Sequence, residues 1–287
     1  MAKSVAALLE LLDLEQLEVD LYRGRTADTE RQRVFGGQVA AQALKAAYLT
    51  VERQRAVHSL HAYFLRPGDG SRPIVFSVDR ARDGRSFSTR RVVAVQRGRP
   101  IFNMTASFHL ERAGLEHQDP MPDAPDPETL VPDLLREPDE GDAWTYFRPW
   151  YEDFRALDVR HVADSPMRAL SAPGEAVHAQ VWLRTASPLS DDPIEQACVL
   201  TYASDLTLIW STVASHPELP ELLSGRIASL DHAIWFHRPF RVDEWLLYDQ
   251  ASPSASGARG FATGRLFDRT GRLVASVAQE GLIELPS

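Results

Sequence analysis

The sequence predicts an α+β protein made of two tandem copies of one folding unit. The string HSLHAYFLRP at 58–67 returns as ASLDHAIWFHRP at 228–239. In each half further strand-like runs follow, and the last begins after a glycine-containing turn, at 99–110 and at 272–285. A helical pattern precedes each set of strands and does not alternate with them, which is typical of α+β units and not of βαβ units.

The elements of the first unit follow from hydrophobic pattern and turn residues. A short amphipathic helix at 1–14 and a strand at 17–22 come first. The pair Gly36-Gly37 opens a helix over 38–49 whose inner face is mostly alanine, so this helix can lie very close to a sheet. Strands separated by Pro-Gly-Asp, Asp-Gly and Arg-Gly turns are then expected at 57–65, 73–82, 86–96 and 99–110.

The composition changes between 116 and 142, where six prolines stand among acidic residues. Such a segment is too stiff and too polar to build a core. We therefore predict an N-terminal unit at 1–115, a proline-rich acidic linker at 116–145 and a C-terminal unit at 146–287.

The second unit carries a well-marked helix start. Asp192 is placed as N-cap, Pro193 as the first helical residue and Glu195 as the partner in a capping box, and the helix is expected to run to about Ser211. Strands are predicted at 157–162, 176–184, 226–236, 244–251, 259–268 and 272–285.

Bulk properties exclude several classes of protein. A formal net charge of −9 argues against a nucleic-acid partner, and a single cysteine, Cys198, excludes an intrachain disulfide and favours the cytoplasm. The start of the chain lacks the pattern of a signal peptide, and no stretch is long enough to insert into a membrane. The motifs G-x-S-x-G, P-loop and H-E-x-x-H are missing, so we expect neither metal nor cofactor.

Two polar residues fall on apolar faces in the second unit only. Asp205 shares a helix face with Cys198, whereas the helix over 38–49 contains no acid. Gln279 alternates with apolar residues on the last strand, where the first unit has Ala106. A buried carboxylate must find hydrogen-bond donors or raise its pKa. Taken singly, either residue is as typical of a structural side chain bonded to the backbone as of a functional one. Together the two residues favour a functional site.

Two other groups invite a functional interpretation. Asp231 and His232 pair an acid with an imidazole, but neighbouring strand residues point to opposite faces and cannot form a dyad with each other. We expect a structural role for His232 at the domain interface. A group of arginines in the first unit could bind a small anion, although a solvated strand face accounts for most of them: Arg80, Arg82, Arg85, Arg90, Arg91, Arg97 and Arg99.

Five strings together closely resemble those of bacterial acyl-CoA thioesterase II. They are VFGGQ at 34–38, HSLHAYFLRPGD at 58–69, YASD at 202–205, DHAIWFHRPF at 231–240 and QEG at 279–281. The resemblance runs in order along nearly the whole chain and leaves only the proline-rich linker unmatched. It implies a double hotdog, in which two long helices are each wrapped by an antiparallel sheet and the sheets are joined. It also implies hydrolysis of fatty acyl-CoA to free fatty acid and CoA, without metal or covalent intermediate.

The family's catalytic group is an Asp, a Thr and a Gln that position the attacking water. The matching motifs place Asp205 and Gln279 at the Asp and Gln positions and Ser229 at the Thr position. A serine keeps the hydroxyl but lacks the methyl group that restricts its rotation. The backbone N–H groups of Gly36 and Gly37 stand at a helix start and are candidates to bind the substrate oxyanion.

The resemblance implies an acyl-CoA substrate, whose phosphates we expect near Arg85 and Arg90. We also expect a homo-oligomer, a dimer or a tetramer. Two alternatives remain open. One is a hotdog acyl-CoA hydratase or dehydratase that uses Asp231 and His232 as acid and base. The other is a non-catalytic acyl-CoA-binding protein in which the serine has removed turnover. The two polar residues at apolar positions favour the thioesterase.

Overall fold

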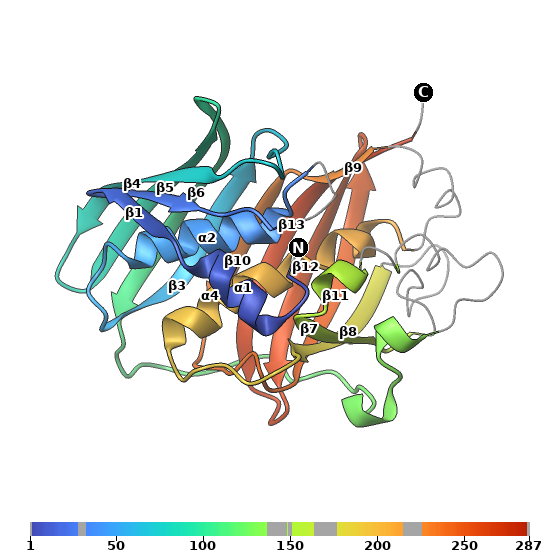
Figure 1. Ribbon diagram of the computed structural model, residues 1–287. Helices are drawn as coiled ribbons and strands as arrows, with labels where there is room; N and C mark the ends of the chain where they lie inside the picture. The colour runs from blue at the N-terminus through green and yellow to red at the C-terminus, as the bar shows by residue number, and fades with distance from the viewer. Residues whose placement is uncertain are drawn as a thin grey trace.

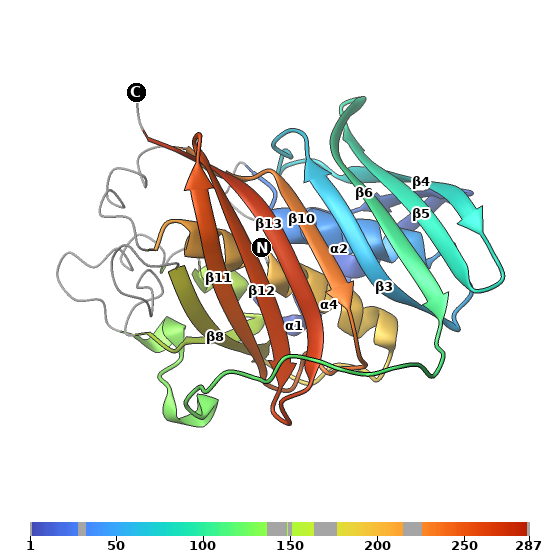
Figure 2. The same cartoon turned by 180° about the vertical axis from the view of Figure 1, so that it is seen from behind.

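One continuous antiparallel sheet organises the whole chain. The computed structural model of the protein describes residues 2–27, 33–136, 148, 151–163, 177–214 and 226–285. Within these ranges 13 strands form the sheet, and the two long helices lie against each other on one of its faces (Figure 1). Figure 2 shows the opposite face of the same strands. Among the described residues no helix is both long and apolar enough to cross a bilayer.

The helices begin where the sequence offers a capping side chain or a pair of glycines. Ser4 accepts from the backbone N–H of Ala7, and Asp192 accepts from that of Ile194. The elements of the first unit are α1 (Val5–Leu12), β1 (Glu15–Glu18), β2 (Leu21–Gly24), α2 (Gly36–Tyr48), β3 (Arg55–Phe64), β4 (Ile74–Asp83), β5 (Phe87–Gln96) and β6 (Arg99–Leu110). Those of the second are β7 (Leu157–His161), β8 (Val177–Thr185), α4 (Pro193–Ser204), β9 (Arg226–Ser229), β10 (Asp231–Phe236), β11 (Leu246–Ser256), β12 (Arg259–Asp268) and β13 (Leu273–Glu284).

The two repeated strings pair with each other at the centre of the sheet. β3 and β10 run antiparallel, with Leu60 opposite Ile234 and Ala62 opposite His232. The strand order is β1-β2-β4-β5-β6-β3-β10-β13-β12-β11-β8-β7, and β9 pairs with β13. Each unit thus supplies one half of a sheet that has no break at the joint. This arrangement confirms the double hotdog.

The alanine face of α2 explains how closely the helices approach the sheet. Ala40, Ala43 and Ala47 are fully buried, together with Leu44 beside them. Residues this small allow backbone and strands to pack at short range. The helices of both units and the inner face of the sheet share one hydrophobic core, so the halves fold as a single body.

The second helix is shorter than the sequence predicts. It ends at Ser204, and Asp205 is its C-cap with φ −84° and ψ −6°. A separate 3-10 turn follows over Leu208–Thr212, inside the range that the apolar pattern assigns to one helix. The apolar spacing continues across the break because the turn stays buried, and a spacing pattern alone does not detect a change of direction.

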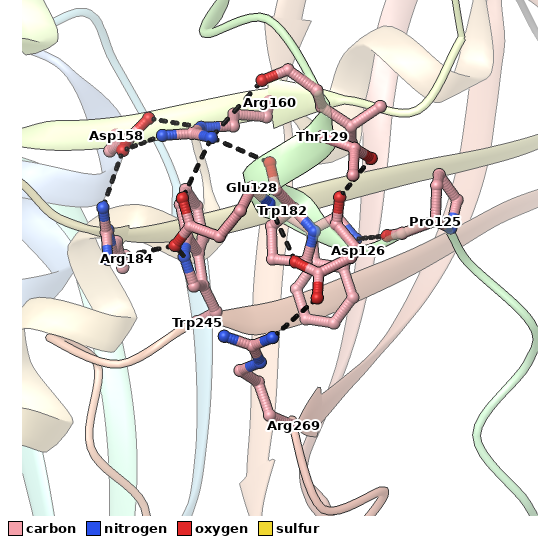
Figure 3. A network of polar contacts seen from close by, with 12 residues as sticks. Pro125, Asp126, Glu128, Thr129, Asp158, Arg160, Trp182, Arg184, Trp245 and Arg269 are labelled. Atoms are coloured by element: carbon pink, nitrogen blue, oxygen red, sulfur yellow. Dashed lines mark hydrogen bonds and ion pairs between the residues drawn. The ribbon is translucent and has the colours of Figure 1, made fainter.

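The proline-rich linker packs on the sheet, although the sequence predicts a segment too stiff and too polar to build a core of its own. It covers a second apolar cluster on the face opposite the helices, formed by Trp182, Trp245, Leu247 and Phe267. The indole N–H of Trp182 donates to the Pro125 carbonyl at 2.9 Å, and that of Trp245 donates to Glu128 at 2.8 Å (Figure 3). Trp182 on β8 and Trp245 just before β11 thus supply the donors, and a proline carbonyl and a carboxylate of the linker accept them.

Arginines of the C-terminal unit also hold this segment. Arg160 donates to the Pro127 carbonyl at 2.8 Å and pairs with Asp158 at 3.0 Å. The guanidinium groups of Arg160 and Arg184 lie 4.7 and 4.2 Å from the centre of the Trp245 ring (Figure 3). The ring is therefore bounded by two cations, and cation–π attraction adds to the apolar contact.

Candidate active site

Asp205 is the centre of a buried polar cluster between the two units. Its carboxyl is 5% exposed at the end of α4, where it faces the first turn of α2. The side-chain amide of Gln279 donates to Asp205 Oδ1 at 2.6 Å. The hydroxyl of Ser229 and the backbone N–H of Gly37 also donate to this carboxyl. The three residues predicted as the catalytic group therefore meet, although they come from α4, β9 and β13.

Close approach explains the two glycines at the start of α2. A Cβ on Gly36 would lie 2.8 Å from Asp205 Oδ2 and 2.9 Å from the ring of Phe64. A Cβ on Gly37 would lie 2.5 Å from the Tyr202 carbonyl oxygen. Only glycine fits at either position without movement of its neighbours. No side chain caps α2, so its first N–H groups are available to an anion.

The N–H of Gly37 also acts on the catalytic carboxyl. It lowers the pKa of Asp205 as a hydrogen-bond donor, and its contact with a substrate oxyanion stays a prediction. The N–H group of Gly36 remains the candidate at the substrate carbonyl.

Burial sets the protonation of the central carboxyl. Removal from water raises the pKa of Asp205 to about 7, against the lowering effect of hydrogen bonds from Gln279, Gly37 and Ser229. A carboxyl with a pKa near neutrality can take a proton from water and give it back at the same pH. A pKa shift of this size in a buried polar cluster is typical of a functional site.

Two buried polar atoms in this cluster have no hydrogen-bond partner. They are Gln279 Oε1 and His232 Nδ1. The Gln279 amide thus uses its nitrogen on Asp205 and leaves its oxygen for another donor. A water molecule is the smallest donor that such an acceptor can take.

His232 lies in the core at the joint between the units, as the sequence predicts. It is fully buried, and burial lowers the pKa of its imidazole to about 3, so the ring is neutral. Its Nδ1 is 3.9 Å from Asp205 Oδ1, and its Nε2 is 2.9 Å from the hydroxyl of Ser204. Asp231 accepts from the backbone N–H of Glu280 at 2.6 Å on the next strand. The adjacent Asp231 and His232 do not form a dyad.

Arg90 does not match its predicted role. Its guanidinium is buried at 1% exposure, donates to Thr50 Oγ1 at 2.7 Å and to the Thr50 carbonyl at 2.9 Å, and pairs with Asp83 at 2.7 Å. These bonds occupy it at the C-terminal end of α2. The expectation that Arg90 contacts CoA is therefore wrong for this arrangement. Arg85 is exposed in the neighbouring β4–β5 turn, and its contact with CoA stays a prediction.

Strand register shows what replaces the polar cluster in the first unit. Arg90 stands opposite Ala106 on β5 and β6, and Ala262 stands opposite Gln279 on β12 and β13. The first unit therefore has the large polar side chain on β5 and alanine on β6, whereas the second unit has alanine on β12 and the large polar side chain on β13. In the first unit the arginine side chain reaches the end of α2, where the second unit has its carboxyl at the end of α4.

Sequence reasoning missed Ser204 and gave Arg90 a different role, for the same reason. A serine beside a candidate acid and an arginine on a strand carry no periodic signal that distinguishes a buried partner from a solvated one. Two differences between the repeats indicated that the units differ at this place: Gln279 where the first unit has Ala106, and an acid on the second helix only.

Comparison with known proteins identifies the family. Residues 25–109 match the family model described as acyl-CoA thioesterase N-terminal domain, and 153–282 match that of acyl-CoA thioesterase. The chain is 38% identical to acyl-CoA thioesterase 2 of Haemophilus influenzae, over 96% of both chains. It is 37% identical to acyl-coenzyme A thioesterase 8 of Homo sapiens, over 96% of this chain and 88% of that one.

A solved structure agrees with this result over the same length. The acyl-CoA thioesterase II TesB2 of Mycobacterium marinum superposes with a TM-score of 0.82 at 49% identity, covering 98% of this chain and 99% of that chain. The sequence, the joined sheets and these relatives lead to one conclusion: the chain belongs to the acyl-CoA thioesterase family and is a thioester hydrolase.

Proposed function

We propose that the protein hydrolyses fatty acyl-CoA with a water molecule held by Asp205, Ser229 and Gln279. The observation that carries this proposal is the buried carboxyl of Asp205, which combines a pKa near 7 with the unpaired oxygen of Gln279 beside it. A thioester needs a water aligned with its carbonyl carbon and a base that accepts one proton. The Asp205 carboxylate is that base, and the Gln279 oxygen accepts the second proton of the water as a hydrogen bond.

The bonds change in two steps. In the first, a water O–H bond breaks, its proton passes to Asp205, and the oxygen bonds to the carbonyl carbon. In the second, the C–S bond breaks and Asp205 returns the proton to the sulfur of CoA. The N–H group of Gly36 at the start of α2 is the proposed donor to the oxyanion formed between these steps. The products are a free fatty acid and CoA.

Thiol release separates this proposal from its alternatives. We expect the wild-type protein to release CoA from palmitoyl-CoA. Asp205→Asn should lower the rate of this release by roughly two to four orders of magnitude, the range for loss of a positioned base. A non-catalytic binding protein would bind palmitoyl-CoA and release no thiol. A hydratase would convert crotonyl-CoA to the 3-hydroxyacyl product. An Asp205→Asn variant that kept more than about a third of wild-type turnover would contradict the assigned role.

Two further expectations belong to this proposal. A homo-oligomer, either dimer or tetramer, and a cytoplasmic location are both predictions from the sequence. Sedimentation of the purified chain and fractionation of cells test them.

A further inference from the structure

A second polar chain reaches Asp205 from the joint between the units. It runs from the hydroxyl of Ser204, through Nε2 of His232 at 2.9 Å, to Nδ1 of the same ring, which is 3.9 Å from Asp205 Oδ1. All three residues are at most 5% exposed, and Nδ1 has no hydrogen-bond partner. A buried imidazole nitrogen without a hydrogen-bond partner is unusual, because removing such a group from water without replacing its hydrogen bond destabilises the fold.

The protons in this chain can be counted. The Ser204 hydroxyl donates to the Thr201 carbonyl at 3.1 Å, and a hydroxyl has a single proton. We assign that proton to the Thr201 carbonyl, so that the oxygen accepts from Nε2, which then carries the proton of the ring. Because the imidazole of His232 is neutral, Nδ1 then carries none. The bare lone pair of Nδ1 faces Asp205.

The groups around Asp205 differ in which protonation state they favour. Gln279 from β13, Ser229 from β9 and Gly37 from α2 all donate to the carboxyl and favour its ionised form. Tyr248 on β11 is the other titratable neighbour. It is buried and uncharged, since burial raises its pKa, and its hydroxyl donates to the Ser204 carbonyl at 3.1 Å. Burial favours the protonated carboxyl, and of the described side chains named here only that of His232 offers it a lone pair.

We propose that His232 is a positioning residue whose Nδ1, fixed as an acceptor by Ser204, receives a hydrogen bond from Asp205 while that carboxyl holds the proton taken from water. The inference rests on the proposed function. His232 itself neither gains nor loses a proton; it orients the Asp205 proton between the two steps of hydrolysis. The proposal requires the distance of 3.9 Å to shorten by about 1 Å through a rotation of the Asp205 side chain.

Ser204→Ala tests the proposal by removing the acceptor of the Nε2 proton. The ring is then free to carry its proton on Nδ1, where it donates to the ionised carboxylate. We expect the acid limb of the kcat/KM profile to move to lower pH by roughly half to one unit. Turnover near pH 7 should fall roughly tenfold, with KM changed less than about twofold.

His232 variants give an independent measurement. His232→Gln keeps an amide near Ser204 but leaves no acceptor at the Nδ1 position. We therefore expect a loss of kcat similar to that of Ser204→Ala. His232→Asn places its amide at the level of Nδ1 and should recover part of it. The ¹⁵N chemical shifts of His232 in the wild-type protein report directly which ring nitrogen carries the proton, and we expect it on Nε2.

The chain offers a matched control in a second serine–histidine pair. Ser107 Oγ lies 2.8 Å from Nε2 of His58, and this pair is on β6 and β3, next to Phe87. Ser107→Ala removes the same contact without touching Asp205 and should keep the wild-type pH profile.

Each outcome decides the proposal. It is overturned by a proton on Nδ1 in the ¹⁵N spectrum, or by Ser204→Ala and His232→Gln profiles that match wild type. If Ser204→Ala does not fold, as seen in its thermal melt, the ¹⁵N measurement and His232→Asn still decide. Failure of the proposed function looks different, because Asp205→Asn would then retain turnover whatever the His232 variants do.

Discussion

Gly36→Ala probes the contact between the start of α2 and the catalytic carboxyl. The added Cβ would lie 2.8 Å from Asp205 Oδ2 and 2.9 Å from the Phe64 ring, where ordinary contacts begin near 3.4 Å. The carboxyl or the helix start must therefore move by 3.4 − 2.8 = 0.6 Å. A misplacement of 1 Å at a reacting group costs roughly a hundredfold in rate, so half of that distance corresponds to roughly tenfold, or about 1.4 kcal/mol in the barrier.

Steady-state thiol release from palmitoyl-CoA measures this loss. We expect kcat to fall roughly tenfold, while circular dichroism shows a folded protein. Gly114→Ala is the control, because nothing lies within 4 Å of the Cβ that it adds. A Gly36→Ala variant with wild-type kcat and KM would refute the reasoning, since the carboxyl could then shift freely without effect on the reaction.

The remaining predictions concern Asp205, Ser229 and Arg90. Asp205 has a pKa of about 7, raised above its ordinary 3.8, so its contribution to stability is full below about 4 and is lost as pH rises toward 7. Thermal melts should therefore show Asp205→Asn gaining stability relative to wild type as pH rises from about 4 to about 7, and a constant difference across that window would contradict the burial argument. Ser229→Thr should keep or raise turnover, and Ser229→Ala should lose roughly tenfold to hundredfold; an alanine variant as fast as wild type would exclude the hydroxyl from catalysis. Arg90→Met should lower the melting temperature with KM for acyl-CoA unchanged, whereas a large rise in KM would restore Arg90 as a CoA contact.

The repeat made most of the fold predictable, because two copies of one string have to occupy equivalent strands. The pairing of Leu60 with Ile234 at the joint follows from that symmetry. The meeting of Asp205 with Gln279 was also predictable, since each is polar on an apolar face and needs a partner. The end of α4 at Ser204 was not, because the following turn is equally apolar.

The packing of the proline-rich segment could not be predicted from its composition. Its acceptors are the backbone carbonyl of Pro125 and the side chain of Glu128, neither of which stands out in the sequence. Their donors, Trp182 and Trp245, lie far away in the chain. A local composition of prolines and acids predicts stiffness and solvation correctly, but it carries no information about which distant surface will accept the segment.

The shared strand pair β3–β10 makes the two units inseparable as folded objects. Cutting the chain between them would leave each half with an unpaired central strand edge, and such edges recruit other strands. The C-terminal half alone would keep Asp205, Ser229 and Gln279 but lose the N–H of Gly37, which comes from the other half. Two separately expressed halves would have to find each other through backbone hydrogen bonds before any turnover could begin. Joining both copies in one chain makes that encounter intramolecular and therefore independent of protein concentration.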